Sequence, residues 1–226
     1  MGRPRKPLLS RERIRDTALE LIDAHGLEDL SMRRLASQLG VQAASLYGHY
    51  PTKDALLDAI ADKIMESVDV TGFASADWRS GLLTWARSYR AALAAHPNTV
   101  PIVASGPVHR DLSLRRADAV HGALVGAGWP PRHATMIGAS VKYLVVGAAA
   151  TSFARGFVDD IQVYLDRYPN LVQAHRLREH AEQIDGESFE FALTALVSGL
   201  ALGYDAVAVG RVQEASPARG STTSGR

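Results

Sequence analysis

The apolar residues of this 226-residue chain recur every three or four positions, which is the spacing of one face of an α-helix. No segment shows the sustained apolar-polar alternation of a half-buried strand. The first such face lies between a possible serine cap and a terminating glycine, and it predicts a helix over residues 10–25 with a buried stripe of Ile14, Ala18, Leu21 and Ile22. We therefore expect an all-α fold.

Residues 31–50 predict two short helices joined by a tight turn. Ser31 is a favourable N-cap, and the leucines and alanine that follow it give one apolar face. Gly40 can end the first helix in a left-handed conformation, and Leu46 then faces the core from the second helix. This arrangement is typical of a helix-turn-helix, whose second helix lies in the major groove of DNA.

Helical spacing continues through the rest of the chain. After Pro51, a longer helix is expected to start near Lys53 and to connect two domains by about residue 70. Further helices are predicted over residues 77–95, 110–125, 132–153 and 188–209, with shorter pieces at 98–105 and 161–168 and a polar stretch at 173–186. Small residues such as Gly138 and Ala139 are interpreted as points of close helix packing.

About a dozen positions in the N-terminal region match a known family. They resemble the DNA-binding signature of the Tet repressor family and comprise Ser31, Leu35-Ala36, Leu39-Gly40-Val41, Leu46-Tyr47, His49-Tyr50, Lys53 and Leu56-Leu57. The resemblance in these motifs spans residues 10–65. Beyond residue 70 it rests mainly on length and helical content. It implies an N-terminal three-helix helix-turn-helix domain, a C-terminal helical ligand-binding and dimerisation domain, and a homodimer on a palindromic operator in double-stranded DNA.

The chemistry of the second helix predicts base contacts. Gln42 can pair with adenine through its donor and its acceptor, and Ala43 can contact a thymine methyl group. Ser45 can contact a base or a phosphate. The resemblance implies phosphate contacts for Tyr47 and His49, although Tyr47 could equally pack in the core.

Phosphate contacts are also expected from cations on the neighbouring elements. Lys53 stands at the start of the next helix, where its charge and the free backbone amides together suit a phosphate. Arg33 and Arg34 lie in the first turn of the helix that crosses the DNA backbone, and at least one of them should reach a phosphate.

The net charge of +1 conceals an uneven distribution. Residues 1–15 carry six arginines and lysines against one glutamate, a net charge of +5, so the rest of the chain carries −4. Such a basic end suggests a polyanion contacted at one place. Arg3 and Arg5 belong to a run that resembles an AT-hook and could enter a minor groove, or the run could be a solvated tail.

These signals divide the chain into a flexible basic arm (1–9), a DNA-binding domain (10–70), an effector-binding and dimerisation domain (71–209) and a disordered tail (210–226). The chain has no cysteine, its N-terminus lacks the apolar region of a secretory signal, and no stretch is expected to be long enough to span a membrane. A cytoplasmic protein with no membrane partner is expected.

The C-terminal region holds candidate effector contacts. They are the large or polar side chains of Trp85, Tyr89, His96, Trp129, Lys142 and Tyr143, which a dry aromatic core would explain equally well. Apolar neighbours surround Lys142 on its helix, so it either snorkels, pairs with an acid, or faces a ligand cavity. The histidines lie in separate elements without ligand spacing, and neither a metal nor a cofactor is expected.

The favoured function is a transcriptional repressor that a small-molecule effector releases from DNA, with helices 132–153 and 188–209 building the dimer. One alternative is a DNA-binding dimer without an effector, whose C-terminal domain only dimerises or binds protein. An enzyme is not expected, because the chain shows no Glu-x-x-His pair, nucleophile elbow or phosphate loop.

Overall fold

The computed structural model describes residues 9–74, 77–106, 110–165 and 167–215, and these residues form helices without a strand, as predicted. The α-helices are α1 (Arg11–His25), α2 (Met32–Leu39), α3 (Ala43–Tyr47), α4 (Lys53–Met65), α5 (Trp78–Ala95), α6 (Val100–Ala104), α7 (Asp111–Gly126), α8 (Pro131–Ala150), α9 (Gln162–Leu165) and α10 (Ala181–Ala215). Short 3-10 turns occur at η1 (Thr71–Ala74), η2 (Pro97–Thr99), η3 (Ala154–Gly156) and η4 (Ala174–Arg176).

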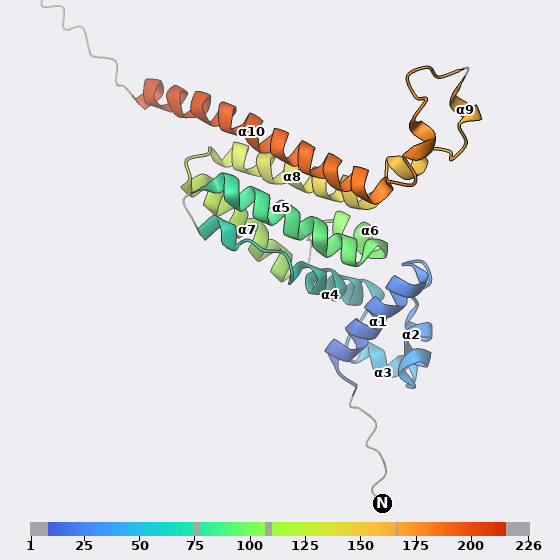
Figure 1. Ribbon diagram of the computed structural model, residues 1–226. Coiled ribbons are helices and arrows are strands. Elements are labelled where there is room, and N and C mark those ends of the chain that lie inside the picture. The colour runs from blue at the N-terminus through green and yellow to red at the C-terminus, as the bar shows by residue number, and fades with distance from the viewer. Residues whose placement is uncertain (1–8, 75–76, 107–109, 166, 216–226) are drawn as a thin grey trace, which may run out of the picture.

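Helices α1 to α3 form a small head at one end of the protomer, and α4 leads from it into the larger C-terminal domain (Figure 1). The predicted caps start α1, α2 and α4. The side chains of Ser10, Ser31 and Thr52 each accept a hydrogen bond from the backbone N–H three residues later, at 3.2, 3.1 and 3.0 Å. Gly40 ends α2 with a φ of 67°, a left-handed conformation that favours glycine.

The C-terminal domain stacks its helices in layers. Helix α5 packs against α8, α8 packs against α6 and α7, and α10 lies along both α5 and α8. Trp78, Trp129 and Tyr204 bring their rings together, with centroids 5.1–5.9 Å apart. The Tyr204 hydroxyl donates to the carbonyl of Ala127 at 2.6 Å, and these contacts fix α10 to the turn before α8.

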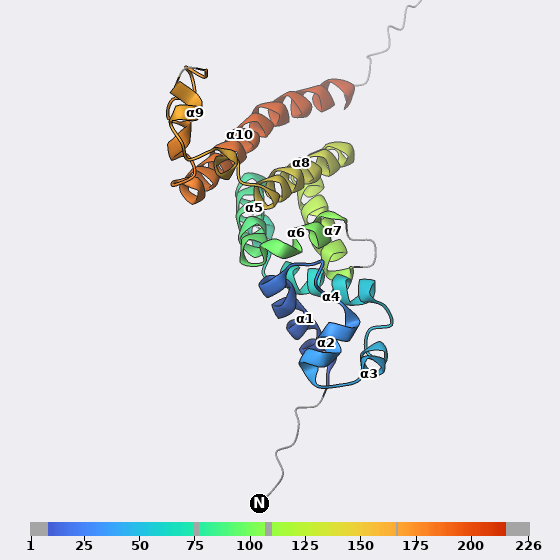
Figure 2. The ribbon, with the colours of Figure 1, turned by 90° about the vertical axis from the view of Figure 1, so that its right-hand side faces the viewer.

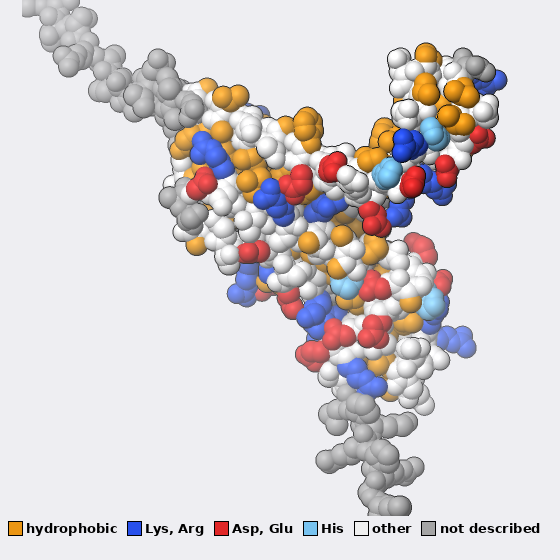
Figure 3. Space-filling view, viewed as in Figure 1, with side chains coloured by type: hydrophobic (Ala, Val, Ile, Leu, Met, Phe, Trp, Pro, Cys, Tyr) orange, Lys and Arg blue, Asp and Glu red, His pale blue; other side chains and the backbone are white. Residues whose placement is uncertain are grey.

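Helices α8 and α10 lie at the end of the protomer opposite the head, and Figure 2 shows both from a second side. Each leaves large apolar side chains uncovered, and Figure 3 shows such side chains along α10. The most exposed of them are Met136 and Tyr143 on α8 and Phe191 and Leu202 on α10. Their spacing of seven and eleven residues places each pair on one helix face.

Several predicted boundaries were wrong. Helix α10 begins at Ala181, inside the polar stretch predicted at 173–186, and it continues to Ala215, past the predicted start of the tail at residue 210. Glutamate and glutamine are good helix formers, and Gln183 donates to Glu187 at 2.8 Å, so the polar composition of this stretch does not make it a linker. Residues 216–226 lie outside the described residues. Helix α9 is only Gln162–Leu165, and the segment around it projects from the body (Figures 1 and 2).

The expectation that no stretch could span a membrane also needs correction. Residues Pro131–Gly156 are long and apolar enough to do so by length and composition alone. However, α8 buries Ile137, Val141 and Val145 against its neighbours in the domain. It also carries Lys142 near its centre, which is costly in a bilayer. The helix is therefore better explained as a core helix with one uncovered apolar face.

Candidate nucleic-acid interface and ligand cavity

Helix α3 presents its polar face to solvent from a fixed position. Leu46 is completely buried and anchors the helix in the head. Gln42, at the N-cap of α3, and Ser45 are exposed, whereas Ala43 is partly buried against the core. Tyr47 is 50% exposed, so the core-packing interpretation of this residue is not supported. The exposed side chains offer the donors and acceptors that base edges and phosphates require.

Contacts between α1 and the residues just after α3 hold α3 in place. The Tyr50 hydroxyl is buried and donates to the carbonyl of Arg11 at 3.0 Å, and the Arg11 guanidinium lies 4.3 Å from the Tyr50 ring centroid. Arg11 also donates to the carbonyl of His49. Burial raises the pKa of Tyr50, which therefore stays a neutral donor. Sequence reasoning assigned no role to Arg11, because its partner lies 38 residues away.

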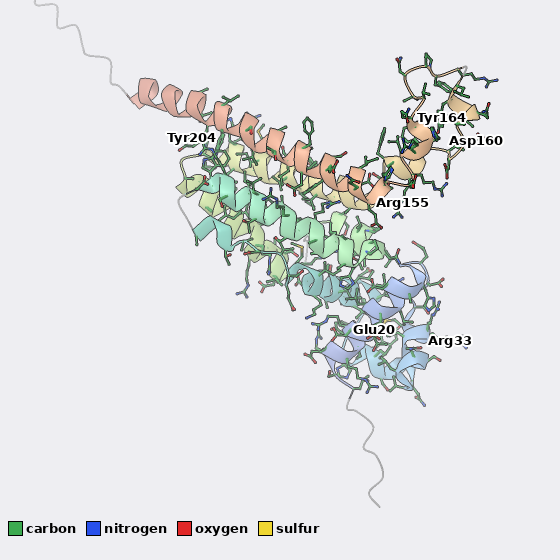
Figure 4. All side chains as sticks on the ribbon, in the orientation of Figure 1. Glu20, Arg33, Arg155, Asp160, Tyr164 and Tyr204 are labelled. Carbon is green, nitrogen blue, oxygen red and sulfur yellow. The ribbon has the colours of Figure 1, made fainter. Side chains whose placement is uncertain are left out.

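The predicted phosphate-binding cations differ in their surroundings. Arg33 is exposed on the outer side of α2, as Figure 4 shows. Arg34 forms an ion pair with Asp29 at 2.7 Å, so a phosphate would compete with that carboxylate. Lys53 lies in the first turn of α4. Arg3 and Arg5 lie outside the described residues.

The C-terminal domain contains a cavity of about 540 Å³ between α5, α7 and α8, with α4 and α6 at its edges. This volume is within the range of pockets that hold drug-sized ligands. The predicted candidates Trp85, Tyr89 and Lys142 line it, and Lys142 is half-buried there. The apolar part of the wall includes Met65, Val103, Leu114, Val120, Ala134 and Gly138. In the described ranges, no three His, Asp or Glu side chains are grouped as metal ligands.

The structure places the other three predicted effector contacts outside this cavity. His96 approaches Asp23 of α1, with Nδ1 and Oδ2 2.8 Å apart. Trp129 belongs to the ring cluster with Trp78 and Tyr204. Tyr143 is 74% exposed, because successive residues of a helix point about 100° apart and Lys142 faces the cavity.

The polar groups of the cavity are mostly donors. Arg110 is only 6% exposed, and its guanidinium donates to Asp58 at 2.7 Å and to the Ser105 hydroxyl at 3.3 Å. Lys142 Nζ lies 3.5 Å from the carbonyl of Ala104. Burial and, to a smaller extent, the charge of Arg110 lower the pKa of Lys142.

Two aromatic donors complete this wall. The indole N–H of Trp85 is buried and has no hydrogen-bond partner among the described residues. Tyr89 is 4% exposed, and burial raises its pKa to about 12, so its hydroxyl keeps its proton at neutral pH. A buried donor without an acceptor is costly, and a ligand with acceptor atoms would remove that cost.

Residues of the cavity wall also hold α4 in position. The Arg110 ion pair with Asp58 is the first contact. The Ser113 side chain donates to Asp62 at 3.0 Å. Arg116 donates to the backbone carbonyls of Glu66 and Val68, just after α4, at 2.9 and 3.0 Å. The cavity and the helix that leads to the head are thus joined by three lining residues of one segment, Arg110, Ser113 and Arg116.

Sequence reasoning missed these three residues. Each partner lies 48–52 residues away along the chain, so no local spacing pointed to the contacts. Gly138 and Ala139 line the cavity, where they were expected to allow close helix packing. A Cβ atom built on Gly138 meets nothing within 4 Å, which is consistent with open space at this point of α8.

Comparisons with known proteins agree with this arrangement. Residues 14–60 match the family described as bacterial regulatory proteins, tetR family, and residues 74–203 match the tetracyclin repressor-like C-terminal domain. An HTH-type transcriptional regulator of Saccharopolyspora erythraea is 33% identical over 64% of this chain and 61% of its own length. The class C tetracycline repressor protein of Escherichia coli is 39% identical over 62% of this chain and 64% of its own length. The alignments thus cover less than two thirds of these two curated relatives.

Solved structures are similar over more of the chain. A possible TetR family transcriptional regulator from Streptomyces coelicolor A3(2) has a TM-score of 0.71 and 30% identity over 85% of this chain and 99% of its own. The Streptomyces coelicolor protein ActR in complex with (S)-DNPA has a TM-score of 0.70 and 29% identity over 86% of this chain and 98% of its own.

Proposed function

The chain belongs to the TetR family of transcriptional regulators, and we propose that it is a homodimeric repressor that a small molecule releases from a palindromic operator. Regulators of this family bind DNA through the helix-turn-helix. The exposed residues of α3 and the cations of α2 and α4 support base and phosphate contacts by this chain. Action on DNA would place it in the cytoplasm.

The uncovered faces of α8 and α10 support the dimer. Tyr143 and Phe191 are 74% and 79% exposed, which is unusual for large apolar side chains unless a partner covers them. A second copy packed on these faces through a twofold axis would form a four-helix interface. Two heads would then contact half-sites about one helical turn apart, ~34–36 Å.

The observation that carries the proposed release is the connection between the cavity and α4. Arg110, Ser113 and Arg116 line the cavity, and the same residues bind α4 and the chain after it. A ligand that changes their positions would change the position of α4 and the spacing of the two heads. The ligand can lower the operator affinity only as far as it binds more tightly to the dimer whose heads are wrongly spaced for the operator than to the dimer whose heads are correctly spaced.

The effector-free alternative receives less support, because a domain that only dimerises needs no cavity of about 540 Å³. Structural relatives include complexes of ActR with (S)-DNPA and with actinorhodin, and of a TetR variant from Acinetobacter baumannii AYE with minocycline. These ligands belong to those proteins. For this chain they support a small-molecule ligand, and they leave its identity to experiment.

The test begins with operator selection. The full chain is incubated with a library of random double-stranded DNA, and the bound DNA is recovered and sequenced. We expect a palindromic motif, and we expect small molecules that bind the free protein to weaken its affinity for that motif. Recovery of no motif would contradict DNA recognition. Cavity ligands that leave operator affinity unchanged would contradict release and favour the effector-free alternative.

A further inference from the structure

The cations of the cavity converge on one point of its wall. Lys142 Nζ lies 3.5 Å from the carbonyl of Ala104, and Arg110 donates to the hydroxyl of the adjacent Ser105 at 3.3 Å. Lys142 comes from α8 and Arg110 from the residue before α7, so two separate elements direct positive charge to the end of α6. Like charges this close raise the energy of both in the absence of an anion.

The cations of the cavity wall differ in their counter-ions. Arg110, Arg116 and Lys142 line the cavity, Asp118 is a lining carboxylate, and Asp58 and Asp62 lie behind Arg110 and Ser113. None of the described residues brings a carboxylate within ion-pair distance of Lys142. Lys142, which is half-buried, therefore lines the cavity as a cation without a described counter-ion.

The remaining polar groups favour a ligand with acceptor atoms. The buried indole N–H of Trp85 has no partner among the described residues, and Tyr89 offers a hydroxyl beside it, with ring centroids 6.3 Å apart. Most of the wall around them is apolar, including Met65, Val103 and Val120. A complementary molecule is thus largely apolar, with oxygen acceptors and one anionic group, and aromatic rings in it would suit the rings of Trp85 and Tyr89.

We propose that the effector is a small aromatic carboxylic acid, whose carboxylate binds Lys142 and Arg110 while its apolar body occupies the cavity. This inference rests on the proposed function, in that it names the chemical class of the ligand for the same cavity. The carboxylate supplies the anion that Lys142 lacks and competes with Asp58 for Arg110. Since Asp58 lies on α4, the competition weakens one of the contacts that hold that helix.

The experiment compares two matched probes, anthraquinone-2-carboxylate and its neutral carboxamide. Their binding to the free full-length protein is measured by isothermal titration calorimetry at neutral pH, without DNA. We expect the carboxylate to bind at least about tenfold more tightly than the amide, because a hydrogen bond between charged groups exceeds one between neutral groups by that much. Equal affinities, or no binding of the carboxylate up to about 1 mM, would overturn the proposal.

Variants show whether the preference depends on Lys142. The preference should fall in Lys142→Met, where only Arg110 still binds the carboxylate, and should remain in Lys142→Arg, which keeps the charge. Arg115→Met is the matched control, since it removes a cation from α7 at a side chain that is 76% exposed and outside the cavity wall. A preference of undiminished size in Lys142→Met would overturn the proposal.

The two proposals fail in different assays. Lys142-dependent binding of the carboxylate without any loss of operator affinity would refute effector release and leave the ligand class intact. Release of the operator by the amide and the carboxylate at equal concentrations would support the proposed function and overturn the carboxylate assignment.

Discussion

Replacement of Asp58 by Asn removes the charge that holds α4 to the cavity wall while keeping the size of the side chain. In the protein, Asp58 Oδ1 lies 2.7 Å from Arg110 Nε, and the two side chains are 26% and 7% exposed. After the substitution, the amide oxygen at position 58 and the Ser105 hydroxyl, at 3.3 Å, can still accept from the buried guanidinium, but neither carries a charge. The perturbation therefore leaves a buried charge without its counter-ion.

The expected loss of stability follows from this burial. Removal of one partner of a fully buried ion pair costs about 3–5 kcal/mol, and water at the partly exposed Asp58 reduces this to about 2–3 kcal/mol. Urea denaturation at one fixed protomer concentration measures the change, because the stability of the proposed dimer would depend on concentration. Operator affinity without ligand should also fall, since α4 has lost a contact that positions it.

The control is Asp111→Asn. Asp111 pairs with Arg115 at the same 2.7 Å, but both side chains are 76% exposed. Exposed ion pairs contribute little to the free energy of unfolding, so the urea midpoint and the operator affinity of this variant should not change measurably. Equal losses in the two variants would refute the argument, because burial would then not be what makes the Asp58 pair important.

Four further results are expected. Lys53→Ala should weaken binding to all DNA sequences and flatten the salt dependence of the affinity, because one phosphate contact and its counter-ion release are lost; binding assays over a salt series measure this. Gln42→Ala should keep that salt dependence and relax the preference at one base pair, which a repeated operator selection measures. Phe191→Glu should convert the dimer to a monomer in light scattering at micromolar concentration, since it places a charge in the uncovered apolar face, and an unchanged mass would contradict this interface. Affinity for anthraquinone-2-carboxylate should be full at neutral pH, where both the ligand and Lys142 are charged, and should fall as pH rises through the lowered pKa of Lys142, below its ordinary 10.5. Lys142→Arg should not show this fall, and a wild-type affinity that stays constant up to pH 10.5 in calorimetry would contradict a contact with the ammonium.

The head could be predicted from sequence because its signals are local. Ser31 and Gly40 each determine the conformation of the residues beside them, so a cap and a left-handed turn follow from residue type and position. The same reasoning located the starts of α1, α4 and α5 within a residue or two. It failed at Ala181, where a polar composition is compatible with both a linker and a helix.

The cavity could be predicted only in part, because it depends on how distant helices pack. Lys142 and Tyr143 are neighbours in sequence, yet one faces the cavity and the other faces outward. No pattern within α8 decides between them until α7 and α10 are in place. The Arg110 contact with Asp58 joins residues 52 apart, and a buried arginine has the same sequence signature as an exposed one.

The most direct test of effector release fills the cavity without touching the head. Gly138→Leu places a side chain where a Cβ atom meets nothing within 4 Å, and leucine is also the better helix former. Operator affinity of both proteins is measured by fluorescence polarisation with and without a panel of aromatic acids. We expect at least one acid to release the wild-type protein from the operator. Gly138→Leu should bind the operator equally well and should be released by none of the acids. Release of Gly138→Leu at the same acid concentration as wild type would contradict effector release through this cavity.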